Sequence, residues 1–518
     1  MEGADIVIVG AGSAGCVLAH RLSHAKVGSV CLLEAGGADD HPAVRVPLAF
    51  SRLFRSARDW ALLSEPEPHL DGRALFIPRG KMLGGSSSLN AMIYIRGRAS
   101  DYDAWACDGW SWREVLPWFV KAEANARLGA PLHGREGPLV VQDPRNASAI
   151  SRAFVEAAVA HGFARNDDFN GASQLGAGLY QLTQKRGRRW STADAYLRTA
   201  DASLRTVTDV MVARVIVERG RAVAVEYVRD GVVQRIAVGR ELVLAAGAIG
   251  SPAILLRSGI GPADELRALG IDVVQSLRGV GANLQDHPVV PIAYACTQPI
   301  TLARAEHWTN VAKWLVMRGG PLTSNVAEAG LFVGSGSGLA EPDLQFHVAP
   351  VWFVEHGFQQ PPGHGFTMGP TLLSPTSRGK LSLRSTSPAD APRIEVGALG
   401  DAKERAALRF GIRLARELAR TEPLASFAAD EHLPGAARTS DDELDAHIRR
   451  YTELLYHPVG TCKMGTGDDA VVDAALRVHG IDGLRVIDAS IMPTIVGGNT
   501  NAPTIMIAEK GADLIARG

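Results

Sequence analysis

The chain has 518 residues, of which 46% are hydrophobic and 21% charged, and its formal net charge is −1. A chain of this length exceeds one hydrophobic core, so we expect two domains or one domain with large insertions. The balanced charge argues against a nucleic-acid-binding protein, which would carry a basic excess. The apolar runs are far shorter than the roughly 20 residues that a membrane-spanning helix requires.

The N-terminus and the cysteines indicate a reducing compartment. The first residues, Met-Glu-Gly-Ala-Asp, lack the basic start and apolar core of a secretory signal, so we expect a cytoplasmic protein. The five cysteines are scattered and form no Cys-x-x-Cys pair. We therefore expect neither a disulfide framework nor a metal site.

The first 34 residues predict a β-α-β unit. Residues 5–9 and 30–33 are short apolar runs typical of buried parallel strands, and residues 16–22 carry apolar side chains at helical spacing. Gly10, Gly12 and Gly15 give the pattern G-x-G-x-x-G between strand and helix. Glycines there let the backbone approach a pyrophosphate at the helix N-terminus. The pattern predicts a dinucleotide site.

Glu34 ends the second of these strands, 19 residues after Gly15. A carboxylate at this place can accept hydrogen bonds from the ribose hydroxyls of an adenosine, and it disfavours the 2′-phosphate of NADP. The fingerprint alone does not distinguish FAD from NAD.

Further elements follow along the chain. Apolar or β-branched runs predict strands at 207–217, 222–228, 233–238, 242–246, 344–351, 379–385 and 484–487. Helical spacing predicts helices at 402–420, 441–456 and 504–517.

Several segments resemble the glucose–methanol–choline (GMC) oxidoreductase family. Arg79–Asn90 resembles its first signature, and Gly247–Gly261 resembles its second. Further segments that look like family segments are Asp101–Trp105, Val280–His287, His457–Gly465 and Asn499–Thr504. The resemblance runs in order from residue 5 to residue 515.

The resemblance implies an α/β fold with a Rossmann-type FAD-binding domain and a discontinuous substrate-binding domain of mixed-sheet α+β type. We expect residues 1–155, 205–295 and 455–518 in the FAD-binding domain, and residues 156–204 and 296–454 in the other.

The fingerprint and the resemblance together give a set of residues expected to bind FAD. These are Gly10, Gly12, Ser13, Ala14, Gly15, Glu34, Ala35, Leu83, Gly84, Gly85, Ser87, Asn90, Ala91, Met92, Val212, Ala246, Gly247, Asp488, Ala489, Asn499, Asn501, Pro503 and Thr504. Some family members attach FAD through a histidine of the first signature. Leu89 stands at the matching position, so we expect non-covalent FAD.

By resemblance, two residues are expected to be catalytic. His457 matches the family's general base or hydroxyl partner, and histidine suits that task near neutral pH. Asn499 matches the second position, where an amide can donate to the substrate oxygen. Asn501 lies only two residues away, and the two roles could exchange.

Leu455 and Tyr456 precede His457 and are expected to line the substrate pocket. Glu328 matches a glutamate that binds a quaternary ammonium group in choline-oxidising relatives, although a structural glutamate is an equal alternative.

The resemblance implies oxidation of a primary alcohol to an aldehyde, with hydride transfer to flavin N5 and electrons passed to an acceptor such as a quinone or a dye. An O₂-dependent oxidase is the near alternative, and a hydroxynitrile-lyase-like enzyme, a non-catalytic flavoprotein or an NAD-dependent enzyme are weaker ones. The sequence leaves the alcohol and any homo-oligomer open. Through its electron acceptor, the protein could also lie at the periphery of the inner membrane.

Overall fold

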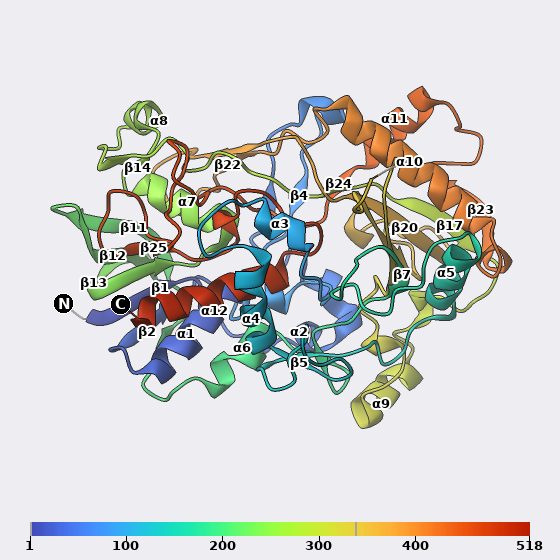
Figure 1. The fold of residues 1–518 in the computed structure, drawn as a ribbon, viewed down its shortest axis with the longest axis horizontal. Helices are drawn as coiled ribbons and strands as arrows, with labels where there is room; N and C mark the ends of the chain where they lie inside the picture. The colour runs from blue at the N-terminus through green and yellow to red at the C-terminus, as the bar shows by residue number, and fades with distance from the viewer. Residues whose placement is uncertain (1–2, 337–338, 518) are drawn as a thin grey trace.

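The computed structural model describes residues 3–336 and 339–517. Two large sheets, each with its own helices, lie at opposite ends of the molecule (Figure 1). None of the helices in these two stretches is long and apolar enough to cross a membrane.

The first sheet has the Rossmann arrangement at its centre. Its strand order is β10-β2-β1-β13-β12-β11, with β25 paired to β13. The strands β10, β2, β1, β13 and β25 are parallel, whereas β11 and β12 form an antiparallel ribbon. The bounds are β1 Gly3–Val9, β2 Val30–Leu33, β10 Arg205–Val207, β11 Met211–Glu218, β12 Arg221–Arg229, β13 Val232–Leu244 and β25 Leu484–Val486.

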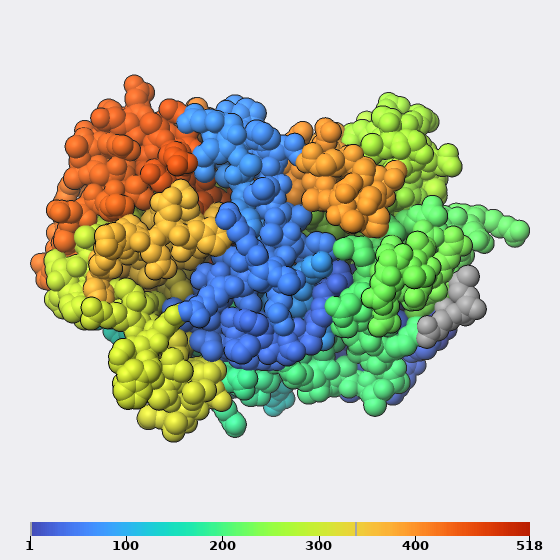
Figure 2. Space-filling view, turned by 180° about the vertical axis from the view of Figure 1, so that it is seen from behind, coloured from blue at the N-terminus to red at the C-terminus, as the bar shows by residue number. Residues whose placement is uncertain are grey.

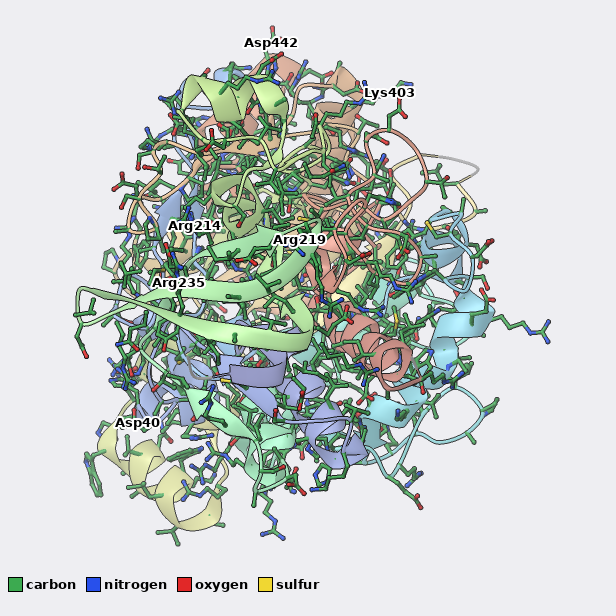
Figure 3. The ribbon with its side chains drawn as sticks, turned by 90° about the vertical axis from the view of Figure 1, so that its left-hand side faces the viewer. Asp40, Arg214, Arg219, Arg235, Lys403 and Asp442 are labelled. Carbon is green, nitrogen blue, oxygen red and sulfur yellow. The ribbon has the colours of Figure 1, made fainter. Side chains whose placement is uncertain are left out.

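Three long helices pack on this sheet: α1 (Ser13–Ala25), α7 (Gly247–Arg257) and α12 (Asn501–Arg517). Helices α1 and α12 lie side by side and also contact α4 (Trp112–Ala122) or α6 (Thr192–Ala195). Arg214 of β11 and Arg235 of β13 lie on either side of β12 (Figure 3), and both pair with Glu226 of β12.

The second sheet is antiparallel, with strand order β23-β17-β20-β19-β18-β7 and with β16 and β24 attached. Helices α5 (Ala149–Ala160), α10 (Ala402–Ala419) and α11 (Asp441–Tyr451) belong to this half. The bounds are β7 Gly176–Leu179, β16 Pro288–Val289, β17 Ile292–Cys296, β18 Ala329–Val333, β19 Leu344–Ala349, β20 Gly365–Leu372, β23 Ala428–Leu433 and β24 Glu453–Leu454.

Smaller elements join the two halves or lie on their surface. Those used below are η1 Pro47–Leu53, β8 Gln184–Lys185, β9 Arg188–Arg189, α9 Trp308–Met317, η6 Pro321–Thr323 and η9 Ala489–Ile491. Helix α9 projects from the body of the molecule (Figures 1 and 2).

Some expected segment bounds differ from the structure. Residues 288–295 were expected with the FAD-binding domain, whereas β16 and β17 are hydrogen-bonded to β20 of the second sheet. The helix expected to reach residue 456 ends at Tyr451, because Thr452 leaves the helical conformation and residues 453–454 form β24.

Candidate active site

One cavity of about 450 Å³ lies between the two halves of the molecule. It starts at the carboxyl ends of β1 and β2 and reaches the second sheet at His347 and Ala349. Clefts at the carboxyl ends of parallel strands are where doubly wound sheets bind ligands. The cavity therefore lies where the dinucleotide fingerprint predicts a ligand.

Glu34 lies at one end of the cavity, together with Val212 of β11. Its carboxylate accepts hydrogen bonds from the backbone N–H groups of Ala11 (2.7 Å) and Gly36 (2.9 Å). Burial raises the pKa of this carboxyl to about 7. The two backbone donors fix the carboxylate facing the cavity, in the place expected for a ribose partner.

Three long helices begin at the middle of the cavity, at Ser13, Gly247 and Asn501. The residues that precede α1 and α7, Gly12 and Ala246, make no side-chain hydrogen bond to the first turn of their helix. A Cβ at Gly12 or at Gly247 would meet no atom within 4 Å. Free N–H groups and open space at helix N-termini suit a diphosphate.

The glycine–serine tract closes over the fingerprint loop. The N–H of Gly84 donates to the carbonyl of Ala11 at 2.8 Å, and a Cβ at Gly85 would lie 2.7 Å from the Cα of Gly12. Farther along, the buried guanidinium of Arg189 donates to Asn90 Oδ1 at 2.7 Å. The tract is thus part of the cavity wall and not a surface linker.

Asp488 joins two sides of the cavity. Its carboxylate accepts from the N–H of Gly247 (2.9 Å), from Ser251 Oγ (2.6 Å) and from the N–H of Ser490 (2.8 Å). Burial raises its pKa. The residue holds the start of α7 against the turn η9 that follows β25.

Most of the residues expected from the sequence to bind FAD line the cavity, and a few lie behind its wall. Lining it are Gly10, Gly12, Ser13, Ala14, Glu34, Ala35, Gly85, Asn90, Ala91, Met92, Val212, Ala246, Gly247, Asp488, Ala489, Asn499, Asn501 and Thr504, whereas Gly15, Leu83, Gly84, Ser87 and Pro503 do not. The hydroxyl of Ser87 is engaged by Gly84 and Thr192. Its contribution is to the wall itself.

His457 and Asn499 meet at the far end of the cavity, which they both line. Asn499 Nδ2 lies 3.2 Å from His457 Nε2. Asn501 is turned elsewhere, because its Oδ1 accepts from Ser13 Oγ at 2.7 Å. The geometry therefore pairs His457 with Asn499.

A second histidine, His287, fixes the protonation pattern of His457. His287 Nε2 lies 3.1 Å from the carbonyl oxygen of Leu373, which only accepts, so this nitrogen carries hydrogen. In neutral His287, Nδ1 is then an acceptor, and it lies 3.0 Å from His457 Nδ1. His457 therefore holds its hydrogen on Nδ1 and keeps a lone pair on Nε2, which accepts from the amide of Asn499.

Burial keeps this pair of histidines neutral. It lowers the pKa of His287 to about 3 and that of His457 well below its usual value, with the neighbouring His287 adding to the shift of His457. A neutral imidazole with an available nitrogen beside a cavity is the form required of a general base.

Asp286 anchors both histidines through the backbone. One carboxylate oxygen, Oδ1, accepts from the N–H of His287 (2.7 Å) and from the N–H of His457 (2.8 Å). Burial raises its pKa to about 7. The sequence marks Asp286-His287 as a family-like segment, but no spacing rule indicates that His287 contacts His457, which lies 170 residues later in the chain.

The wall near His457 is apolar and rich in aromatic side chains. It includes Phe50, Phe54, Val326, Ala349 and Phe353, along with Leu455 and Tyr456 expected from the sequence. The rings of Phe54 and Tyr456 lie 5.7 Å apart, and Tyr456 donates to or accepts from His356 Nδ1 at 2.6 Å. This end of the cavity therefore suits an apolar ligand.

The structure places Glu328 away from the cavity, which favours the structural alternative for this residue. Its side chain does not line the cavity but is buried behind it. The carboxylate accepts from the N–H of Ser148 (2.7 Å), from Ser151 Oγ (2.7 Å) and from Ser324 Oγ (2.5 Å). With these three donors it ties α5 to the segment before β18, a structural task.

Comparisons with known proteins agree with this geometry. The GMC oxidoreductase N-terminal model matches residues 4–289, and the C-terminal model matches residues 375–508. The chain belongs to the GMC oxidoreductase family.

Relatives of this GMC protein are similar over almost their whole length. An alcohol dehydrogenase [acceptor] of Pseudomonas putida is 43% identical, with 99% of this chain and 96% of the relative covered. An oxygen-dependent choline dehydrogenase of Rhizobium johnstonii is 41% identical, with 99% and 95% covered. The crystal structure of pyridoxine 4-oxidase from Mesorbium loti is 33% identical, with a TM-score of 0.92 and 99% of each chain covered.

The comparisons confirm the predictions of a GMC-type α/β fold, of an oxidoreductase and of FAD as its cofactor, and they support oxidation of an alcohol as the reaction. A small-molecule substrate and an electron acceptor follow from the same reaction class. The cavity fits FAD on this chain's own features: the open space at Gly12, three helix N-termini and the fixed carboxylate of Glu34. Leu89 lines the cavity and offers no atom for a covalent bond to a flavin.

Proposed function

We propose that this GMC oxidoreductase oxidises an uncharged, apolar primary alcohol to the aldehyde, with His457 as the base. One observation carries the proposal, a chain of hydrogen bonds that leaves a lone pair on His457 Nε2. At one end the carbonyl of Leu373 orients His287, which accepts from His457 Nδ1, and at the other end the amide of Asn499 donates to His457 Nε2. That nitrogen faces the cavity at the end where the wall is apolar.

The residues divide the work at the hydroxyl group. A substrate hydroxyl that replaces the contact between Asn499 and His457 donates its proton to His457 Nε2 and accepts a hydrogen bond from Asn499 Nδ2. His287 Nδ1 accepts a hydrogen bond from the Nδ1–H of His457 and so keeps the ring of His457 oriented. FAD, when bound, supplies the acceptor for the hydride that leaves the α-carbon.

The charges near His457 support an uncharged substrate. Burial lowers the pKa of His347, which lines the cavity, to about 3, so its ring is neutral. Burial also raises the pKa of Glu453 to about 8, and its carboxyl accepts from the N–H of His356. With Glu328 behind the wall, a quaternary ammonium group would be buried without an anionic partner, which is costly.

For the second half of the reaction, we propose an acceptor other than O₂; the name of the Pseudomonas putida relative gives an unspecified acceptor for that protein. We also propose a cytoplasmic location. None of the five cysteines, all of which lie in the described residues, forms a disulfide bond, in agreement with a reducing compartment.

The test is an anaerobic absorbance spectrum of the purified protein before and after addition of benzyl alcohol, 1-octanol or choline, and then after admission of air. We expect the flavin band to bleach with an apolar alcohol, to persist with choline, and to return slowly in air. Bleaching by choline alone would refute the substrate class. Rapid recovery in air would make the protein an oxidase.

A further inference from the structure

Helix α9 turns its apolar side chains toward solvent. Trp308 and Val316 are 72% and 83% exposed, and Val311, Leu315 and Met317 are exposed as well. We call these five residues the apolar ridge. Surface helices normally bury their apolar face, and contiguous exposed apolar groups mark contacts with another partner.

Helix α9, which carries the apolar ridge, is held in place by its one buried side chain. Trp314 packs inward, and its Nε1 donates to the carbonyl of Gly187 at 2.9 Å. Gly187 is the tip of the hairpin formed by β8 and β9, and a Cβ there would lie 2.1 Å from the carbonyl oxygen of Arg318. Helix α9 and the hairpin are therefore one tightly packed surface unit.

This unit is basic. The hairpin brings Lys185 and Arg186, both exposed, and the partly exposed Arg188. Helix α9 and its flanks add Arg304, Lys313 and Arg318. We call these six residues the basic rim. Residues 299–323 contain a single acidic residue, Glu306, and its carboxylate pairs with Arg52.

We propose that the apolar ridge and the basic rim dock this protein on a membrane surface that contains anionic lipids. A helix lying in the interface inserts apolar side chains among the acyl chains while Lys and Arg side chains reach the headgroups. A negative lipid surface attracts each nearby cation. The projecting shape of α9, visible as the yellow lobe in Figure 2, suits a deformable surface.

A second copy of the chain is the less suitable occupant. In a two-fold dimer the same patch meets itself, so residues of the rim would face residues of the rim. Six cations would then lie opposite six cations with only Glu306 in each copy to offset them. The charge of the patch thus favours lipid over self-association.

Docking would bring the substrate half of the cavity close to the lipid. Helix α9 contacts η6, and η6 contacts η1, whose Phe50 lines the cavity. Apolar alcohols and apolar electron acceptors both partition into membranes. The docking itself goes beyond the proposed reaction and does not depend on it.

The test is co-sedimentation of the FAD-bound protein with vesicles. We would use phosphatidylcholine vesicles with about one third phosphatidylglycerol, and pure phosphatidylcholine as comparison, at low and at high salt. We expect binding to the anionic vesicles that weakens in high salt. Absence of binding to anionic vesicles at low salt would overturn the proposal.

Three double variants identify the surface. L315S/V316S removes part of the ridge and K185Q/R186Q part of the rim, and we expect each to lower vesicle binding by about tenfold or more. V232S/V233S is the matched control, because these valines are similarly exposed (58% and 60%) on the opposite half of the molecule, and it should bind like the wild type. Flavin content and activity with a soluble dye should stay unchanged in all three.

Two outcomes contradict the proposal. Equal losses in the control and in the ridge variant would show that binding does not depend on α9. A wild-type dimer in light scattering that L315S/V316S converts to a monomer would show that a second copy covers the ridge.

Discussion

At the scale of single residues, replacing His457 by alanine removes the nitrogen that we propose accepts the hydroxyl proton. Positioned general bases contribute about 10²–10⁴-fold, so we expect the rate of flavin reduction to fall by about 10²-fold or more. His457 is not among the residues expected to bind FAD, so the flavin spectrum of the variant should persist. Anaerobic stopped-flow bleaching measures this rate, and a wild-type rate in a flavin-loaded variant would remove His457 from its role.

We propose that His287 acts by positioning His457. Two substitutions can distinguish this positioning role from a role in packing alone. His287→Leu removes the Nδ1 acceptor, so His457 can hold its hydrogen on either nitrogen, and we expect flavin reduction to slow by about tenfold or more. His287→Asn places Oδ1 near the position of Nδ1 and should recover most of the rate. Equal rates in the two variants, with unchanged pH profiles, would contradict the positioning role.

The sequence identifies several residues of this site, but it does not reveal the contacts that these residues make in the folded protein. His457 and Asn499 lie in family-like segments and can be singled out. Only the folded structure separates the two asparagines, because Asn499 contacts His457 whereas Asn501 contacts Ser13. Glu328 was a reasonable candidate, since its burial depends on Ser148 and Ser151, which lie 180 and 177 residues earlier in the chain at the start of α5. The pairing of His287 with His457 is likewise a product of tertiary packing.

At the scale of elements, the fingerprint glycines serve two separate purposes. A Cβ at Gly15 would lie 1.8 Å from the carbonyl oxygen of Gly10, so Gly15→Ala must push α1 away from β1, whereas a Cβ at Gly12 enters open cavity. We expect Gly15→Ala to lower the free energy of unfolding of the apoprotein by about 1–3 kcal/mol. Gly12→Ala should change it by about 0.5 kcal/mol or less.

Both variants should bind FAD at least about tenfold more weakly, since the fingerprint brings the backbone close to the pyrophosphate. Denaturant titration of the apoproteins and FAD titration measure the two effects. A Gly12→Ala protein that binds FAD like the wild type would show that the open space at Gly12 is not used by the cofactor.

The β-α-β unit could be read from the sequence because each of its elements is fixed by local pattern and glycine spacing. The later elements were less certain. Two runs expected as separate strands, 233–238 and 242–246, form the single strand β13, which ends at Leu244 and has a register shift against β1. Strands β16 and β24 are too short to show a pattern, and only their pairing with each other and with β20 assigns them to the second sheet.

At the scale of the whole molecule, the fold class follows from motifs that occur in order along the chain, but the assembly of the halves does not. The cavity is made by the ends of β1 and β2, by the starts of α1, α7 and α12, and by residues of the second sheet. These segments come from every part of the sequence. Their meeting requires the complete fold.

Buried histidines also make the stability of the whole molecule depend on pH. Burial lowers the pKa of His287 and His347 to about 3 and that of His447 to about 4, whereas in an unfolded chain histidine titrates near 6.5. Between these values the unfolded chain binds more protons than the folded one. Stability contributed by these sites is therefore complete above pH about 6.5 and is lost as the pH falls toward 3.

His447 allows this contribution to be isolated far from the catalytic pair. Its Nε2 donates to the carbonyl oxygen of Pro291 at 2.9 Å, and the amide of a glutamine can supply the same donor without titrating in this range. We expect His447→Gln to lose less stability than the wild type between pH 6.5 and 4, by up to about 1.4 kcal/mol per pH unit. Denaturant unfolding at a series of pH values measures the difference. If the free energy of unfolding fell equally with pH in the two proteins, His447 would not be held neutral in the folded state. The loss of stability in acid would then originate at other sites.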